Sequence, residues 1–196
     1  MFANRFTAFI DACSLVSVLR RNLLLTLAEA EFFRVRWSEQ VLEETERAIA
    51  KICTKKNYPD AADRAALARQ KIESAFEDAK VSNFDQFMIT GEALPDQNDA
   101  HVLDAALKIK ADTIVTENLR DFPPAVLEPL NIEVRSADAF IADTIALDAG
   151  RAVAAINKMR LRLRKPEMTP NILLQNMDAS GLTETVDILR HHTRSL

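Results

Sequence analysis

Short apolar runs alternate with longer segments of helical periodicity along this chain. The runs "RFTAFIDA" (5–12), "DTIVT" (112–116) and "NIEVR" (131–135) have the length and β-rich composition of buried strands. Between and around them, residues 14–33, 38–57, 59–79, 99–110 and 136–147 repeat apolar positions at helical intervals, and the first of these segments is predicted to break near residues 21–22. Strands that alternate with helices predict an α/β fold with a mainly parallel central sheet.

Cap residues support these helices. Ser38, Asp99 and Ser136 stand where helix N-caps are expected, and Pro59 stands near the start of another helix. The stretch "ENLRDFPP" (117–124) is predicted to be a loop that ends at its two prolines.

The pattern changes after residue 147. Residues 151–165 form a predicted helix whose apolar stripe is separate from most of its basic residues, namely Lys158, Arg160, Arg162, Arg164 and Lys165. Pro166 is expected to stop this helix, Thr169 to cap the next one, and Gly181 to precede a last short helix. We therefore predict a domain at 5–147 and a helical C-terminal extension at 148–196, packed on it.

Composition narrows the class of protein. Apolar residues make up 48% and charged residues 28% of the 196 residues, which is typical of a folded chain. No apolar run approaches the roughly 20 residues that span a bilayer, and the start of the sequence lacks the pattern of a signal peptide. The two cysteines, Cys13 and Cys53, fit reduced thiols. A cytoplasmic protein without a membrane partner is expected.

Charge is unevenly distributed over a net charge of −4. From Asp148 onward eight Lys or Arg stand against five Asp or Glu, so this part carries +3 and the first 147 residues carry −7. The acidic part is suited to cations and the basic tail to phosphates.

Acidic and amide side chains gather where the predicted topology brings strand ends together. Asp11 ends the first strand, and Thr116 ends a later one and is followed by Asn118 and Asp121. In parallel sheets the working residues lie beyond the carboxyl ends of the strands. The predicted helix starts add Glu44, in "VLEETER", and Asp99, in "LPDQNDAHVLDAA". Oxygen ligands of this kind suit Mg²⁺ or Mn²⁺.

Each of these residues also has a structural interpretation. Asp99 is a good N-cap by itself, and Asp121 fits a cap of the proline turn. Asp96 and Asp104 are expected to be solvated. The three acids of the Glu-rich helix, Glu43, Glu44 and Glu46, fit a solvent-exposed face. His101 is expected to be packed or half-exposed, and Cys13 to be an inert core residue.

Four stretches together resemble the PIN domain, and within that superfamily the VapC-like toxins that carry an extra helical C-terminus. They are "FIDACSL", "RWSEQVLEETERAI", "LPDQNDAHVLDAALKIKADTIVTENLRDFPP" and "SADAF". The resemblance spans about residues 5–141 and implies a three-layer α/β sandwich and a metal-dependent endoribonuclease.

The resemblance also implies roles for residues. Asp11, Glu44 and Asp99 would be the metal-binding acids, with Glu43 as the alternative to Glu44. Asn118 matches the fourth position, where an acid is common, and Asp121 is a further candidate. Thr116 matches a small hydroxyl residue that supports the first acid or a water.

Two departures from the family pattern matter. Cys13 stands where many relatives have Asn, and Asn118 is neutral, which would weaken a second metal site.

The resemblance further implies a mechanism in which Mg²⁺ or Mn²⁺ would activate water, giving 5′-phosphate and 3′-hydroxyl ends. RNA would be gripped by Arg20, Arg21 and the basic tail helix. A cognate antitoxin and a homodimer are expected partners.

Two other classes compete with this interpretation. A phosphatase with an aspartate nucleophile would need an acid two residues after Asp11, where Cys13 stands, and a receiver domain would need a Lys after a late strand. A PIN-like module that only binds protein or RNA would have lost catalysis, although it would not then need Asp11, Glu44 and Asp99.

Overall fold

The structure is a computed structural model that describes residues 6–84, 94–163 and 167–196. Five parallel strands form one sheet in the order β3-β2-β1-β4-β5. The strands are β1 (Thr7–Ile10), β2 (Arg34–Ser38), β3 (Lys80–Val81), β4 (Thr113–Val115) and β5 (Glu133–Arg135). The predicted α/β fold with a parallel sheet is confirmed, and the first predicted strand is the central one.

Two of the strands were not predicted from the sequence. In β2, buried Val35 and Trp37 alternate with the more exposed Arg34 and Arg36. This alternation spans only two periods and lies between the helices predicted at 14–33 and 38–57, so the sequence does not reveal it as a strand. Strand β3 has two residues, too few to show any period.

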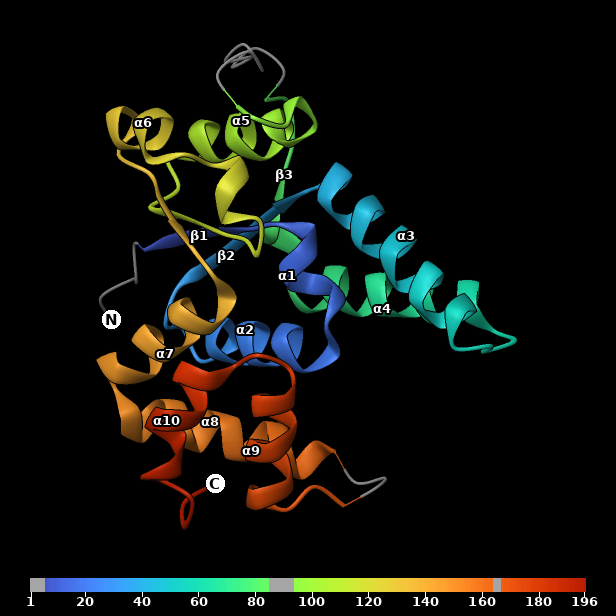
Figure 1. The fold of residues 1–196 in the computed structure, drawn as a ribbon, viewed down its shortest axis with the longest axis vertical. Helices are drawn as coiled ribbons and strands as arrows, with labels where there is room; N and C mark the ends of the chain where they lie inside the picture. Colours follow the sequence, from blue (N-terminus) through green and yellow to red (C-terminus); the bar gives the residue numbers. More distant parts are fainter. Residues whose placement is uncertain (1–5, 85–93, 164–166) are drawn as a thin grey trace.

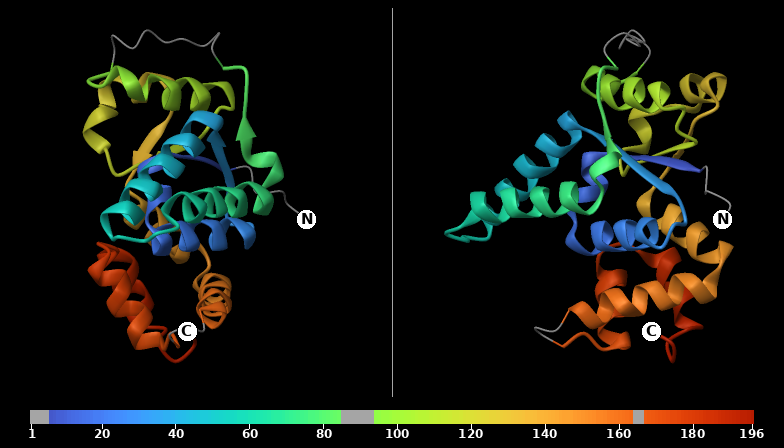
Figure 2. Two further views of the ribbon diagram at one scale, coloured as in Figure 1. Left: turned by 90° about the vertical axis from the view of Figure 1, so that its right-hand side faces the viewer. Right: turned by 180° about the vertical axis from the view of Figure 1, so that it is seen from behind.

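Helices cover both faces of the sheet. The α-helices are α1 (Ala12–Val16), α2 (Val18–Glu29), α3 (Glu39–Lys55), α4 (Ala61–Ala75), α5 (Ala100–Lys108), α6 (Pro124–Leu127), α7 (Ala137–Leu147), α8 (Ala149–Arg162), α9 (Pro170–Ala179) and α10 (Thr183–Arg190). Short 3-10 turns lie at Glu77–Ala79, Gln97–Asp99, Leu119–Asp121 and Glu128–Leu130. Helices α5 and α6 lie on one side of the sheet and α2 and α7 on the other, with α8 to α10 beyond α2 and α7 (Figure 1). Helices α3 and α4 pack together as an arm that projects away from the sheet (Figure 2).

The predicted break in the first helical segment lies earlier than expected. Ser17, with extended backbone, separates α1 from α2, whereas residues 21–22 are within α2. The Arg21 guanidinium, which is 9% exposed, donates to the Leu15 carbonyl at 2.6 Å and to the Val16 carbonyl at 3.3 Å. A buried arginine therefore satisfies the carbonyls left open at the bend. The prediction that Arg21 contacts RNA is wrong.

The C-terminal extension (148–196) shares the core of the sheet domain. Ile156, Leu173, Met177 and Leu189 are buried in the same hydrophobic cluster as Phe9 of β1. Helices α8 and α10 pack on α2 and α7. The extension is thus attached by a continuous apolar core, and the division at residue 147 stays a prediction.

Most predicted helix ends are confirmed. Ser38, Ser136 and Thr169 each accept a backbone N–H in the first turn of their helices, and Asp148 does so for α8. The predicted stop of α8 involves residues 164–166, which lie outside the described residues, as does residue 5 of the first predicted strand. Within the described ranges, none of the helices has both the length and the apolar character needed to cross a bilayer.

Candidate functional site

Asp11 lies at the point where the sheet order reverses. The chain leaves β1, whose neighbours are β2 on one side and β4 on the other. The Asp11 N–H donates to the Val115 carbonyl at 3.0 Å, so the carboxyl ends of β1 and β4 are joined at the first acid. Ligands of open parallel sheets bind in the crevice at such a reversal.

The Asp11 carboxylate is buried and accepts three hydrogen bonds. Oδ1 accepts from the Ala12 N–H at 2.6 Å, at the start of α1. Oδ2 accepts from Thr116 Oγ1 at 2.7 Å and from Cys13 Sγ at 2.9 Å. Asp11 is 4% exposed and Thr116 is 0% exposed. These donors hold a carboxylate where burial alone would disfavour its charge.

Cys13 belongs to this polar network, whereas the sequence predicts a residue of the apolar core. Burial, the negative charge of Asp11 and the hydrogen bond to it raise the pKa of the Cys13 thiol to about 12. The sulfur also accepts the Glu117 N–H at 3.1 Å. Cys13 is therefore a protonated donor to Asp11, in line with the predicted inert thiol.

Asp99 is the N-cap residue of α5, as predicted, but its carboxyl does not perform the cap. Its side chain makes no cap hydrogen bond, and exposed Asp96 caps the preceding 3-10 turn instead, through the Asn98 N–H at 2.9 Å. The Asp99 Oδ2 atom is buried without a hydrogen-bond partner among the described residues. Burial and the charges of Asp11, Asp121 and Asp96 raise the pKa of Asp99 to about 6. The Asp99 carboxylate is thus repelled by neighbouring acids, and no hydrogen-bond donor among the described residues offsets this repulsion at Oδ2.

Glu44 is held by His101. The His101 Nε2 atom lies 3.2 Å from Glu44 Oε1, and 10% of the His101 side chain is exposed, as its predicted packing requires. Burial acts to raise the pKa of Glu44, but the hydrogen bond and charge of His101, together with Arg47 and Gln40, outweigh burial, and the net shift is downward. Glu43 is exposed on the other side of α3. The structure therefore favours Glu44 over Glu43 as the acid of this helix.

The two predicted site residues of the loop after β4, Asp121 and Asn118, differ in their placement. The negative charge of Asp121 contributes to the raised pKa of Asp99, and the role of Asp121 stays a prediction. Asn118 is attached by its backbone, whose N–H donates to Thr116 Oγ1 at 3.0 Å, while the residue itself is exposed. Thr116 Oγ1 therefore links Asp11 to the loop that follows β4 through two hydrogen bonds.

Two further expectations are corrected. Asp104 was expected to be solvated but is 6% exposed. Arg20 was expected to grip RNA, but its guanidinium lies 3.2 Å from Glu117 Oε2 and is mostly buried. Glu117 itself was missed, because nothing in "TEN" separates a site residue from a loop acid.

The four acids Asp11, Glu44, Asp99 and Asp121, which we call the acidic site, come from four separate elements. In the part of the chain that the structure describes, no three His, Cys, Asp or Glu side chains are gathered closely enough to hold an ion as they stand. The unpartnered Asp99 oxygen and its repulsion by Asp11 and Asp121 still leave hard oxygen ligands whose negative charge is not compensated. Such a donor set fits a hard divalent cation, provided that side chains rotate towards it.

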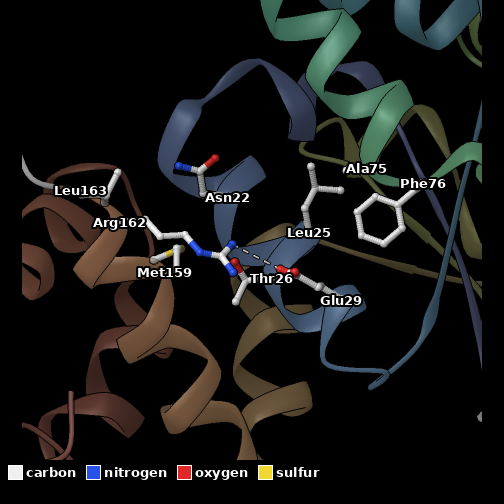
Figure 3. Close-up of a pocket in the computed structure, with 9 residues that line it drawn as sticks. All are labelled: Asn22, Leu25, Thr26, Glu29, Ala75, Phe76, Met159, Arg162 and Leu163. Atoms are coloured by element: carbon white, nitrogen blue, oxygen red, sulfur yellow. Dashed lines mark hydrogen bonds and ion pairs between the residues drawn. The ribbon is translucent and has the colours of Figure 1, made fainter.

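A separate hollow lies between α2 and α8, with a volume of about 350 Å³. Arg162 reaches across it to Glu29 at 3.4 Å, and Leu25 and Phe76 also line this hollow (Figure 3). The residues that line it include none of the predicted site residues. Arg160, on the same helix, donates to the Met168 carbonyl. Two basic residues of α8 thus serve intramolecular contacts, and RNA contact by this helix stays a prediction.

Comparison with known families decides the relationship. Residues 7–120, more than half of the chain, match the family model described as PIN domain. The chain belongs to the PIN-domain family. Residues 137–191 match the model described as VapC50 C-terminal domain, so this PIN protein carries the expected VapC-like extension.

A relative among curated proteins agrees with this assignment. A Mycobacterium tuberculosis protein described as "Putative ribonuclease VapC50" is 39% identical over 83 residues, which is 42% of this chain and 47% of that protein. The alignment therefore spans less than half of the relative's length. No solved structure matches the chain. The predicted PIN fold and the VapC-like resemblance are confirmed, and the residue roles stay predictions.

Proposed function

We propose that this PIN-domain protein is an endoribonuclease that uses Mg²⁺ or Mn²⁺, with Asp11, Glu44 and Asp99 as the metal-binding acids. The observation that supports this most directly is Asp99, whose buried oxygen has no partner among the described residues and whose pKa is raised by burial and by Asp11, Asp121 and Asp96. An uncompensated cluster of acids beside a strand-end crevice costs stability and fits a site built for a cation. The relative described as a ribonuclease supports RNA as the substrate.

The residues around the proposed cation have separate tasks. Thr116 and Cys13 hold Oδ2 of Asp11, and the Ala12 N–H holds Oδ1, so the orientation of this carboxylate is fixed. His101 fixes one oxygen of Glu44. Asp121 and Asn118 border the site on the loop after β4 and are candidates to position water or a second ion. When bound, the cation would lower the pKa of a water molecule and neutralise the phosphodiester.

Cleavage of labelled RNA with Mn²⁺, with Mg²⁺ and with EDTA tests this proposal. We expect cleavage that chelation abolishes, with 5′-phosphate and 3′-hydroxyl ends. Glu44→Gln should lower the rate by at least about 100-fold, whereas Glu43→Gln, one residue away and exposed, should leave it within about twofold. Cleavage that persists in EDTA, or equal rates for the two variants, would contradict the assignment.

The main alternative is a PIN protein that binds RNA or protein without cutting. It predicts unchanged RNA and no Mn²⁺ binding by wild type, so the same experiment separates the two. A phosphatase or phosphotransfer domain would instead release phosphate from a small phosphoester.

The VapC-like extension also supports a toxin with a cognate antitoxin as its partner, and a homodimer as its assembly. Growth arrest on induced expression, relieved by Asp11→Asn, tests the toxin. Light scattering after gel filtration tests the dimer, for which about 22 kDa would be a contradiction.

A further inference from the structure

An ion pair joins α2 to the loop after β4. Arg20 Nη2 lies 3.2 Å from Glu117 Oε2, with 14% of the Arg20 side chain and 32% of the Glu117 side chain exposed. Partial burial reduces the screening that makes most surface ion pairs weak. The other Glu117 oxygen, Oε1, accepts the Ala137 N–H at 3.0 Å, at the first turn of α7. Both oxygens of Glu117 are therefore held.

Arg20 also contacts the C-terminal extension. Its Nη2 donates to the Ser180 carbonyl at 3.4 Å, at the end of α9. Ser180 precedes Gly181, whose φ of +78° turns the chain from α9 into α10 and is a conformation that suits glycine. Arg20 thus bridges the turn between α9 and α10 and the loop of the acidic site.

A second set of hydrogen bonds, between α7 and α10, lies next to the Arg20 bridge. Asp138, beside Ala137 on α7, accepts the N–H groups of Glu184 and Thr185, both at 2.9 Å, in the first turn of α10. The carboxylate therefore caps a helix of the extension from the sheet domain. Extension, α7 and Glu117 form one connected set of polar contacts.

Glu117 is itself part of the Asp11 environment. Its N–H donates to Cys13 Sγ, which donates to Asp11 Oδ2. Its neighbour Thr116 donates to the same Asp11 oxygen and accepts from Asn118. A displacement of Glu117 would move the two donors on Asp11 Oδ2, Thr116 and Cys13.

We propose that Arg20 is a positioning residue that couples the C-terminal extension to the acidic site, by holding Glu117 and with it the donors on Asp11. The part of this inference that concerns catalysis rests on the proposed function. The extension is then a component of the site, and its α9–α10 turn sets the position of residues 116–118.

The test compares full-length variants. Arg20→Met removes the bridge, and Arg20→Lys keeps the positive charge but loses the guanidinium that reaches both Glu117 and Ser180. Glu117→Gln keeps an acceptor for Ala137 but removes the ion pair. Arg160→Met is the matched control for hydrogen exchange alone, because Arg160, like Arg20, has a buried Nε without a partner among the described residues and donates to a carbonyl of the extension, at Met168. All are measured at a temperature at which circular dichroism shows them folded.

Hydrogen exchange of the amides of residues 117 and 118 is the first readout and needs no activity. We expect faster exchange there in Arg20→Met and Glu117→Gln, partial recovery in Arg20→Lys, and no change in Arg160→Met. The second readout is Mn²⁺ affinity and RNA cleavage, for which we expect a loss of about tenfold or more in affinity and kcat, as for other residues that orient metal ligands, with KM little changed.

The outcomes separate the two proposals. Unchanged exchange in Arg20→Met and Glu117→Gln overturns the coupling, whatever the activity. Faster exchange in a protein whose wild type neither binds Mn²⁺ nor cuts RNA supports the coupling and overturns the proposed function. Equal effects in Arg160→Met and Arg20→Met reduce Arg20 to a general stabilising residue and also overturn the proposal. If Arg20→Met does not fold, Glu117→Gln and Arg20→Lys decide.

Discussion

Without a bound cation, Asp99→Asn should stabilise the fold although it removes a proposed metal ligand. Burial and the neighbouring Asp11, Asp121 and Asp96 raise the pKa of Asp99 from its ordinary 3.8 to about 6. The charged form is therefore disfavoured in the folded state by about 3 kcal/mol, at about 1.4 kcal/mol for each pKa unit. Because Asp99 is only half-buried, water screens these charges, and we take about half of that value, roughly 1.5 kcal/mol.

The pH dependence follows from the direction of the shift. Below the unfolded pKa the carboxyl is protonated in both states and the penalty is absent. As the pH rises through about 4 to 6, the unfolded state ionises first, so folded wild type loses stability relative to Asp99→Asn. The advantage of Asp99→Asn should be about 1.5 kcal/mol at pH 7.5 and less than half of that at pH 4.

Urea unfolding in EDTA at the two pH values measures this difference. Asp63→Asn is the control, because Asp63 is exposed on α4 and is not among the charges that act on Asp99. With millimolar Mn²⁺ the order should reverse, since a ligand of the folded state stabilises the protein that binds it better. A less stable Asp99→Asn in EDTA, or an advantage that does not change with pH, would refute the reasoning about a crowded acid.

Three other outcomes are expected. Thr116→Val keeps the shape but removes a buried donor to Asp11, and it should cost about 2 kcal/mol, seen as a melting temperature lower by about 4–8 °C; an unchanged melting temperature would mean that the hydroxyl is not needed. Cys13, with a pKa of about 12, should react with a maleimide at pH 8 much more slowly than a free cysteine peptide, as mass spectrometry would show; equal rates would contradict its role as a protonated donor. Asp138→Ala should lower the free energy of unfolding in urea by about 1–3 kcal/mol and speed hydrogen exchange at the start of α10. Asp187→Ala, which replaces an exposed acid of α10, should change both values little.

The fold was predictable where the apolar pattern was long or complete. Strand β1 is a four-residue buried run, and the helices carry clear caps at Ser38 and Ser136, so both kinds of element were found. Strand β2 was missed because Val35 and Trp37 alone form its buried face. What makes β2 a strand is pairing with β1, which is a property of the folded sheet.

The site was predictable in its residue types but not in its contacts. Acids after strand ends were identified because parallel topology places strand ends together, and the structure couples Asp11, Asp99 and Asp121 electrostatically. Arg20 was assigned to RNA because a sequence shows a charge but not its partner. Its partners, Glu117 and Ser180, are 97 and 160 residues away in the chain.

The pairing of β1 with β4 has a consequence for a chain that is still being synthesised. Thr116 Oγ1 and Asp11 Oδ2 are joined across 105 positions, and the Arg20 bridge closes across 160. Contacts between such distant segments form late in folding because long loops must close first. A nascent chain therefore cannot join Asp11 to Thr116 before residue 116 has emerged from the ribosome, and the Arg20 bridge to the C-terminal extension must wait for residue 180.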